Sequence, residues 1–267
     1  MTALLTTAAQ AALDAGSSIM QIYDRDFSVE YKDDRSPLTE ADKAAHHIIC
    51  AALESFGLPI LSEESKAVPY AQRKGWTKYW LVDPLDGTKE FIKKNGEFTV
   101  NIALIENGRP VLGVVYAPVL QTIYYGLQAG SQGHGAWRSD NCTGKSVDEV
   151  LASAVPCPVL HAPRTAPLRV VASRSHCNEE TKKFIEELEV KYGAVELVSS
   201  GSSLKLCMVA EGLADVYPRI APTMEWDTAA AQAVVEASGG TVMQYGTNEP
   251  LHYNKENLRN PFFIVKR

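Results

Sequence analysis

A short apolar run that ends in two closely spaced acids constrains this chain more than any other segment. Residues 80–88 read Trp-Leu-Val-Asp-Pro-Leu-Asp-Gly-Thr. The apolar residues 80–82 predict a buried strand, and the Pro and Gly that follow predict a tight turn. Asp83 and Asp86 would therefore lie close together, where two carboxylates repel unless a cation lies between them. Oxygen ligands of this kind suit Mg²⁺, so a metal-assisted phosphatase is the first hypothesis.

The residues after the second acid support the same hypothesis. Residues 87–91 predict the start of a helix, where unpaired backbone N–H groups face outward and attract an anion. The alternative is ordinary turn chemistry, in which Asp83 and Asp86 accept backbone N–H bonds and bind no metal. This segment alone leaves both interpretations open, and further acids are needed to favour the metal.

Bulk properties exclude several classes of protein. The chain has 267 residues, 45% of them hydrophobic, which suits one large domain or two lobes. A net charge of −6 predicts no nucleic-acid partner. Five scattered cysteines without metal-ligand spacing suggest reduced thiols in a cytoplasm. We expect neither a secretory signal nor a transmembrane helix, since no apolar stretch approaches ~18 residues.

The periodicity of the chain predicts layered helices and strands. Proline-rich residues 153–167 suggest a boundary between an N-terminal α+β lobe, residues 1–155, and a C-terminal α/β lobe, residues 156–267. The expected helices are 3–22, 39–53, 179–192, 203–210 and 228–237. The expected strands are 27–31, 59–62, 98–104, 111–116, 122–126, 168–172, 195–198, 214–217, 241–243 and 262–265. This order favours an α+β fold of stacked layers over one doubly wound sheet.

Three further acids lie at the ends of predicted elements. Glu63 follows a short strand, as Asp83 does, while Asp42 lies in the first turn of a predicted helix and Asp227 lies where another begins. Each has an ordinary explanation, because acids are common in loops and as helix caps, and Asp42 can form a capping box with Thr39. Their joint placement where metal and phosphate sites are built nevertheless favours a site.

Cations lie in short polar segments of the second half. Lys205 and Arg219 would suit a phosphate-bearing substrate, and His176 could bond a base or a phosphate. The alternatives are surface cations and a structural histidine.

Three motifs together resemble the inositol monophosphatase superfamily of Mg²⁺-dependent, lithium-sensitive phosphomonoesterases. They are Ser-Glu-Glu at 62–64, Asp-Pro-Leu-Asp-Gly-Thr at 83–88 and Trp-Asp-Thr-Ala-Ala at 226–230, in the order found in the family. Thr-Lys-Glu-Phe-Ile at 88–92 and the segment 95–104 are similar to the 3'(2'),5'-bisphosphate nucleotidase branch of the CysQ type. Inositol phosphatases usually carry Thr-Thr-Asn-Phe at the first of these places. The resemblance covers essentially the whole chain.

The resemblance implies a layered αβαβα sandwich of the inositol monophosphatase and fructose-1,6-bisphosphatase type. It also implies the roles of individual residues. The metal ligands for two to three Mg²⁺ would be Glu63, Asp83, Asp86, Asp227 and the carbonyl of Leu85. The catalytic residues would be Asp42 and Thr88, which polarise the attacking water, together with Glu63. The substrate-binding residues would be Gly87, Thr88, His176, Ser202, Lys205, Arg219 and Asp227.

The expected reaction is hydrolysis of adenosine 3',5'-bisphosphate to AMP and phosphate, with activity on the sulfated nucleotide as well. The alternatives are an inositol or sugar phosphatase of the same fold and a non-catalytic nucleotide or metal sensor. We expect a small-molecule nucleotide partner, with a monomer favoured, and a cytoplasmic location that leaves peripheral contact with the inner membrane open.

Overall fold

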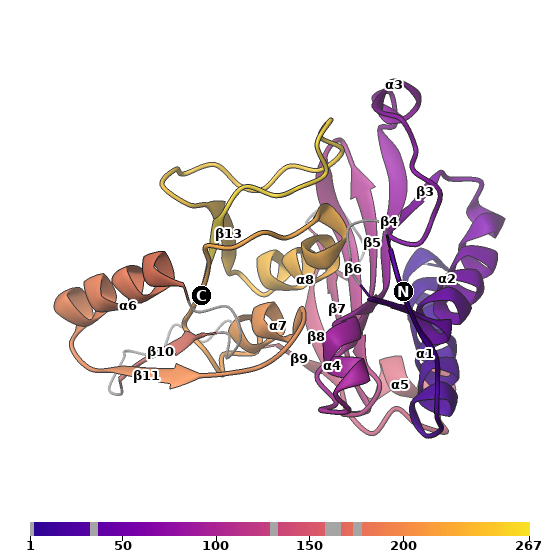
Figure 1. The fold of residues 1–267 in the computed structure, drawn as a ribbon, viewed down its shortest axis with the longest axis horizontal. Coiled ribbons are helices and arrows are strands. Elements are labelled where there is room, and N and C mark those ends of the chain that lie inside the picture. Colours follow the sequence, from indigo (N-terminus) through magenta and orange to yellow (C-terminus); the bar gives the residue numbers. More distant parts are fainter. Residues whose placement is uncertain (1–2, 33–36, 129–132, 158–166, 173–177) are drawn as a thin grey trace.

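Helices and sheets of the chain alternate in five layers (Figure 1). The computed structural model describes residues 3–32, 37–128, 133–157, 167–172 and 178–267. Helices α1 and α2 cover one face of a seven-stranded sheet, α7 and α8 lie between this sheet and a five-stranded sheet, and α6 covers the far side of the smaller sheet. This arrangement is the predicted αβαβα sandwich.

The N-terminal half supplies the helices of the first layer and the whole seven-stranded sheet. The strands lie in the order β3-β4-β5-β6-β7-β8-β9, and all neighbours are antiparallel except the parallel pair β3 and β4. Its helices are α1 (Ala3–Tyr23), α2 (Glu40–Leu53), α3 (Tyr70–Arg73), α4 (Thr88–Ile92) and α5 (Val147–Ala152), with a 3₁₀ turn at Glu54–Phe56. Its strands are β1 (Val29–Tyr31), β2 (Pro37–Thr39), β3 (Ile60–Ser62), β4 (Lys78–Asp86), β5 (Thr99–Glu106), β6 (Arg109–Ala117), β7 (Thr122–Leu127), β8 (Gly135–Ser139) and β9 (Val155–Pro156).

The C-terminal half forms the mixed five-stranded sheet, in the order β11-β10-β12-β14-β13. Its strands are β10 (Leu168–Val171), β11 (Val195–Val198), β12 (Val216–Arg219), β13 (Thr241–Gln244) and β14 (Phe263–Lys266). Its helices are α6 (Glu179–Tyr192), α7 (Leu204–Ala210) and α8 (Glu225–Ala237).

Helices α1 and α2 form where the sequence predicts them, for local reasons. Alanine has the highest helix propensity, and the buried residues of α1 recur at helical spacing along one face. Helix α2 begins with the predicted capping box, in which Thr39 Oγ1 accepts from the N–H of Ala41 and Asp42 Oδ2 accepts from the N–H of Thr39. The sequence alone thus determines where α2 begins.

Helix α8 packs very closely on the large sheet because two glycines face it. Gly113 of β6 pairs with Gly126 of β7. A Cβ atom at Gly113 would lie 2.1 Å from the carbonyl oxygen of Ala230, and one at Gly126 would lie 2.7 Å from that of Ala233. Only glycine permits this approach, which holds the first turn of α8, with Asp227, in place beside the large sheet.

Several predicted boundaries were wrong. The turn expected at residues 83–87 is instead the end of β4, which runs through Pro84 to Asp86 with a shift of register against β5. A β-bulge accommodates an extra residue while the strand continues, so the proline is tolerated there. Helix α8 begins at Glu225, before the predicted residue 228, and the predicted linker contains β9. Strands β2 and β8 and helices α3 and α5 were not predicted. Among the residues described, no helix is long and apolar enough to cross a membrane.

Candidate active site

Three acids from distant parts of the chain converge beside the end of β4. Glu63 follows β3, Asp83 lies in β4, and Asp227 lies in the first turn of α8. Each contributes one carboxylate oxygen to a group whose oxygens all lie within 4.8 Å of one another. The spacing brings the three charges close enough to share one cation.

Burial makes this cluster electrostatically costly without a cation. Asp83 is 1% exposed, and burial followed by the charges of Glu63 and Asp86 raises its pKa well above the usual value. Burial and the charge of Asp86 act likewise on the pKa of Asp227. Burial also raises the pKa of Asp86 to about 6, against the opposing influence of Lys205. Clustered acids that repel one another are stabilised by a divalent ion, so the donor set fits a hard metal such as Mg²⁺.

The other two predicted metal ligands line the same cavity. It has a volume of about 260 Å³, and Leu85 and Asp86 line it together with Glu63, Asp83 and Asp227. Asp86 does not belong to the group of carboxylate oxygens within 4.8 Å. All five residues predicted to hold metal therefore meet in one cavity, three of them in a tight group.

Thr88 and Asp42 contact each other at the edge of this cavity. Thr88 Oγ1 donates to Asp42 Oδ1 at 3.1 Å and also lies 3.4 Å from the carbonyl oxygen of Leu85. The second carboxylate oxygen of Asp42 caps α2. Burial is the main cause that raises the pKa of Asp42. The structure thus places the predicted pair in hydrogen-bond contact, with Asp42 held rigidly by its own helix.

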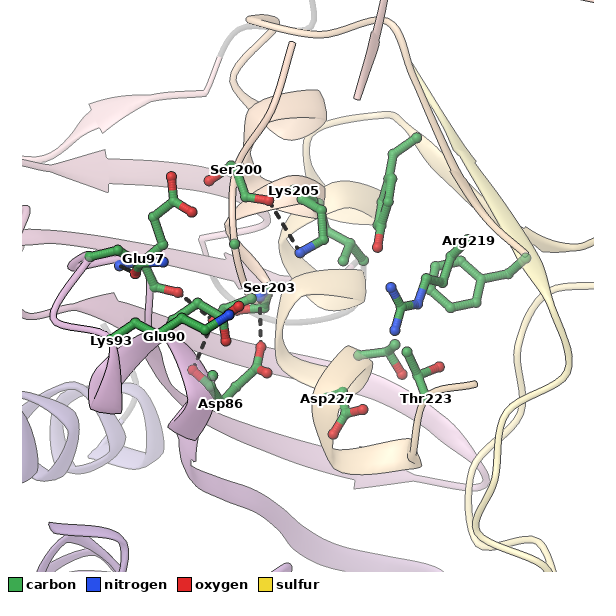
Figure 2. Close-up of a pocket in the computed structure, with 18 residues that line it drawn as sticks. Asp86, Glu90, Lys93, Glu97, Ser200, Ser203, Lys205, Arg219, Thr223 and Asp227 are labelled. Carbon is green, nitrogen blue, oxygen red and sulfur yellow. Dashed lines mark hydrogen bonds between the residues drawn. The ribbon is translucent and has the colours of Figure 1, made fainter. Parts of the chain in front are cut away.

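A second, larger cavity adjoins the first on the side of the C-terminal sheet. Its volume is about 410 Å³, and Lys205 and Arg219 face Asp86 and Asp227 across it (Figure 2). The two cavities share four lining residues, which are Asp86, Gly87, Glu90 and Asp227. One cavity is rich in acids and the other contains cations, so a molecule with two anionic groups could span both.

Lys205 and Arg219 in the second cavity make few hydrogen bonds to the residues described, although Tyr217 contacts both. Lys205 is 7% exposed, and its only hydrogen bond to a described residue is a 3.5 Å contact with the carbonyl oxygen of Ser200. Burial lowers the pKa of Lys205 to about 8, although Asp86 favours its charged form. Arg219 donates to the carbonyl oxygen of Pro222, and its Nε is buried with no partner among the residues described. An anion in the cavity would satisfy both groups.

Ser202 lines the second cavity and contacts the backbone of Asp86, which lines both cavities. Its hydroxyl oxygen lies 2.8 Å from the carbonyl oxygen of Asp86 and 2.7 Å from that of Glu97, which share its single proton. Gly87 adopts a φ of +97°, and a Cβ there would lie 2.3 Å from Ser202 Oγ. Glycine is required at this position both for its backbone angle and for the approach of Ser202.

Sequence reasoning missed several residues at the site. Lys32 Nζ lies 2.9 Å from Glu63 and 2.6 Å from Glu64. Although burial opposes its charge, these two carboxylates raise the pKa of Lys32 above its usual value. Glu90 lines both cavities, and the N–H of Ser203 donates to Asp86 Oδ2 at 2.6 Å. Nothing local in the sequence marks Lys32, whereas Glu90 lies inside the motif at 88–92. His176, predicted near the nucleoside, lies outside the described residues.

Known proteins are similar in sequence to this chain. A model of the inositol monophosphatase family matches residues 1–261. The 3'(2'),5'-bisphosphate nucleotidase CysQ of Salmonella typhimurium strain LT2 is 45% identical over 266 residues, which cover 98% of this chain and 99% of the relative. The protein of the same name from Escherichia coli strain K12 is also 45% identical, over 267 residues, with the same two coverages.

Solved structures agree with these similarities. The crystal structure of CysQ from Bacteroides thetaiotaomicron, described as a bacterial member of the inositol monophosphatase family, has a TM-score of 0.87 and 49% identity, covering 98% of this chain and 96% of its own. The inositol monophosphatase from Anabaena has a TM-score of 0.70 at 25% identity, covering 98% of this chain and 90% of its own. The resemblance noted in the motifs is confirmed, and the chain belongs to the inositol monophosphatase family.

Proposed function

We propose that this chain is a Mg²⁺-dependent 3'(2'),5'-bisphosphate nucleotidase that hydrolyses adenosine 3',5'-bisphosphate to AMP and phosphate. The observation that carries the proposal is the pair of joined cavities, one lined by clustered acids and the other containing Lys205 and Arg219. A nucleotide with two phosphates would place one in each. Relatives named as this nucleotidase match nearly the whole chain, which supports the same substrate, and we extend the proposal to the sulfated nucleotide.

The acidic cavity would hold the metal. Glu63, Asp83, Asp86, Asp227 and the carbonyl of Leu85 would bind two to three Mg²⁺ ions, and their oxygen donors suit this cation. When bound, Mg²⁺ would supply Lewis-acid chemistry for the hydrolysis of a phosphomonoester. The binding would also remove the repulsion among the buried carboxylates.

Thr88 and Asp42 would prepare the attacking water. Because the hydroxyl proton of Thr88 is donated to Asp42, the Thr88 oxygen can accept a hydrogen bond from water and orient it. Glu63, close to Asp83 in the same cavity, would assist as a catalytic residue. The backbone N–H groups near Gly87 and Thr88 would bind oxygens of the phosphate that is cleaved.

The second cavity would hold the phosphate that is retained. Lys205 and Arg219 would bind it with charge-assisted hydrogen bonds, and Ser202, which lines the same cavity, would bind it with them. His176 would lie near the nucleoside. A boundary between lobes at residues 155 and 156, a monomeric state, and a cytoplasmic location with peripheral membrane contact left open remain predictions beside this proposal.

A substrate panel tests the function. The purified chain is assayed for phosphate release from adenosine 3',5'-bisphosphate, 3'-AMP and inositol 1-phosphate, with Mg²⁺ and with a chelator in its place. We expect the highest kcat/KM with the bisphosphate, and no release with the chelator. Preference for inositol 1-phosphate would favour the inositol phosphatase alternative, and no release from any substrate would favour a sensor.

A further inference from the structure

Three buried polar side chains, one of which belongs to a residue that lines the second cavity, form a closed ring of hydrogen bonds. The ring residues Thr99, Asn101 and Ser203 are 0%, 1% and 2% exposed. Ser203 Oγ donates to Asn101 Oδ1 at 2.7 Å, and Asn101 Nδ2 donates to Thr99 Oγ1 at 3.2 Å. Thr99 Oγ1 and Ser203 Oγ lie 2.8 Å apart. The hydroxyl proton of Ser203 is donated to Asn101, so in the contact between Thr99 and Ser203 the Thr99 hydroxyl is the donor. Each of the three side chains therefore donates one hydrogen bond and accepts one within the ring.

Two members of the ring come from the strand that adjoins the acidic motif. In the register of β4 with β5, Asn101 pairs with Asp83 and Thr99 pairs with Asp86. Alternate residues of a strand point to opposite faces, so Thr99 and Asn101 share the face that is covered by the C-terminal half of the chain. These two polar residues bond to each other, and Ser203 supplies the remaining partner of each.

The third member of the ring touches the proposed metal ligand and precedes the proposed phosphate ligand. The N–H of Ser203 donates to Asp86 Oδ2 at 2.6 Å, and α7 begins at the next residue and carries Lys205. Ser202, just before it, has a φ of +49°, which a residue with a side chain rarely adopts. Local preference therefore does not set this conformation, and surrounding contacts must hold it.

We propose that the Thr99–Asn101–Ser203 ring is a positioning element that fixes the N–H of Ser203 on Asp86 and thereby orients this carboxylate for metal. The inference deepens the proposed function and rests on it, because it takes Asp86 as a metal ligand. Without the ring, the backbone at Ser203 would be free to reorient. Asp86 would then lose the hydrogen bond from the N–H of Ser203 that orients its carboxylate. Partners that orient a metal ligand typically change metal affinity about ten- to a hundredfold when removed. Since α7 follows directly, the same loss would also shift Lys205.

A matched pair of variants at one position tests the ring. Thr99→Val keeps the shape of the side chain but removes the hydroxyl, whereas Thr99→Ser keeps the hydroxyl. We expect Thr99→Val to weaken Mg²⁺ binding, measured by titration calorimetry without substrate, by about tenfold or more. We also expect a higher KM for the bisphosphate. Thr99→Ser should restore both to near the wild-type values.

Thr122→Val is the control for general loss of a buried hydroxyl. Thr122 is 4% exposed in β7 of the same sheet and lines neither cavity, and its hydroxyl oxygen lies 2.8 Å from Asp140 Oδ1 and 3.1 Å from the carbonyl oxygen of Leu120. Its Mg²⁺ affinity should equal that of the wild type. Should Thr99→Val fail to fold, Ser203→Ala replaces it in the Mg²⁺ titration with the same expected loss of affinity. This variant breaks the ring and keeps the backbone N–H of residue 203.

The outcomes separate the two proposals. A wild-type chain that neither binds Mg²⁺ nor releases phosphate overturns the proposed function itself. An active wild type whose Thr99→Val variant (or Ser203→Ala, if that replaces it) binds Mg²⁺ with unchanged affinity overturns the positioning role alone. The positioning role also fails if Thr122→Val weakens Mg²⁺ binding as much as Thr99→Val does, since the effect would then be one of stability.

Discussion

The hydroxyl of Thr88 donates a hydrogen bond to Asp42 across 3.1 Å, although 46 residues separate them in the chain. Thr88 is the first residue of α4, but its side chain makes no capping bond there. Asp42 lies in the first turn of α2 and is held by its own capping box. The pair is therefore formed by two helix starts that meet at the edge of the acidic cavity, and the Thr88 hydroxyl has one further contact among the described residues, at 3.4 Å from the carbonyl oxygen of Leu85.

Thr88→Ala should lower kcat far more than it raises KM, because the hydroxyl is proposed to orient the attacking water. Steady-state kinetics with the bisphosphate measures both constants. Thr88→Ser keeps the hydroxyl and should retain most of kcat. If Thr88→Ala instead lowers the melting temperature and leaves kcat normal, the residue has only a structural role.

Asp83→Asn should reduce turnover by roughly a hundredfold or more, because it removes a proposed ligand from the centre of the metal group. The fold should persist, and in the absence of metal the variant should melt at the same temperature or higher. The reason is that one of several mutually repelling buried charges is lost. Phosphate release and thermal unfolding measure the two effects.

The control for this change is Asp148→Asn, which neutralises an exposed acid of α5 that lines neither cavity. It should have the turnover of the wild type. Wild-type turnover in Asp83→Asn at modest Mg²⁺ would contradict the assignment of Asp83 to metal.

Lys205→Ala and Arg219→Ala should each impair the bisphosphate far more than 3'-AMP. Both cations are proposed to hold the retained phosphate, and a charge-assisted hydrogen bond contributes about 1.5–3 kcal/mol. The kcat/KM for adenosine 3',5'-bisphosphate should therefore fall on the order of ten- to a hundredfold. The rate with 3'-AMP should change little, since that substrate has no second phosphate.

Lys145→Ala, which removes an exposed lysine remote from both cavities, serves as the matched control. Equal losses with both substrates in Lys205→Ala or Arg219→Ala would mean that these cations serve the cleaved phosphate or the fold.

Gly113→Ala should destabilise the chain, because the new Cβ would lie 2.1 Å from the carbonyl oxygen of Ala230 and push α8 off the sheet. Overpacking of this kind costs about 1–3 kcal/mol in the free energy of unfolding, which urea denaturation measures. Turnover should also fall, since α8 carries Asp227. Gly75→Ala is the control, with no atom within 4 Å of the added Cβ. Equal stability of the two variants would show that the close contact is not required.

The sequence by itself determined the features that depend on residues adjacent in the chain. The capping box of Thr39 and Asp42, the helix α6 at Glu179–Tyr192 and the strand β5 were predicted closely, because caps and periodic burial are local signals. The motif at 83–88 likewise indicated clustered acids, and the order of three motifs indicated the family. The turn predicted at Pro84 was wrong, because the strand continues there through a bulge, and a bulge depends on the partner strand.

Only the tertiary structure decided which polar residues meet. Thr99 and Asn101 alternate with apolar residues in β5, a pattern equally typical of a strand with one face in water. They are buried because the loop before α7, from another part of the chain, packs on them and closes their hydrogen bonds. Lys32 reaches Glu63 in the same way, from a segment with no local signal. Such contacts depend on the packing of distant elements, which the periodicity of one segment does not contain.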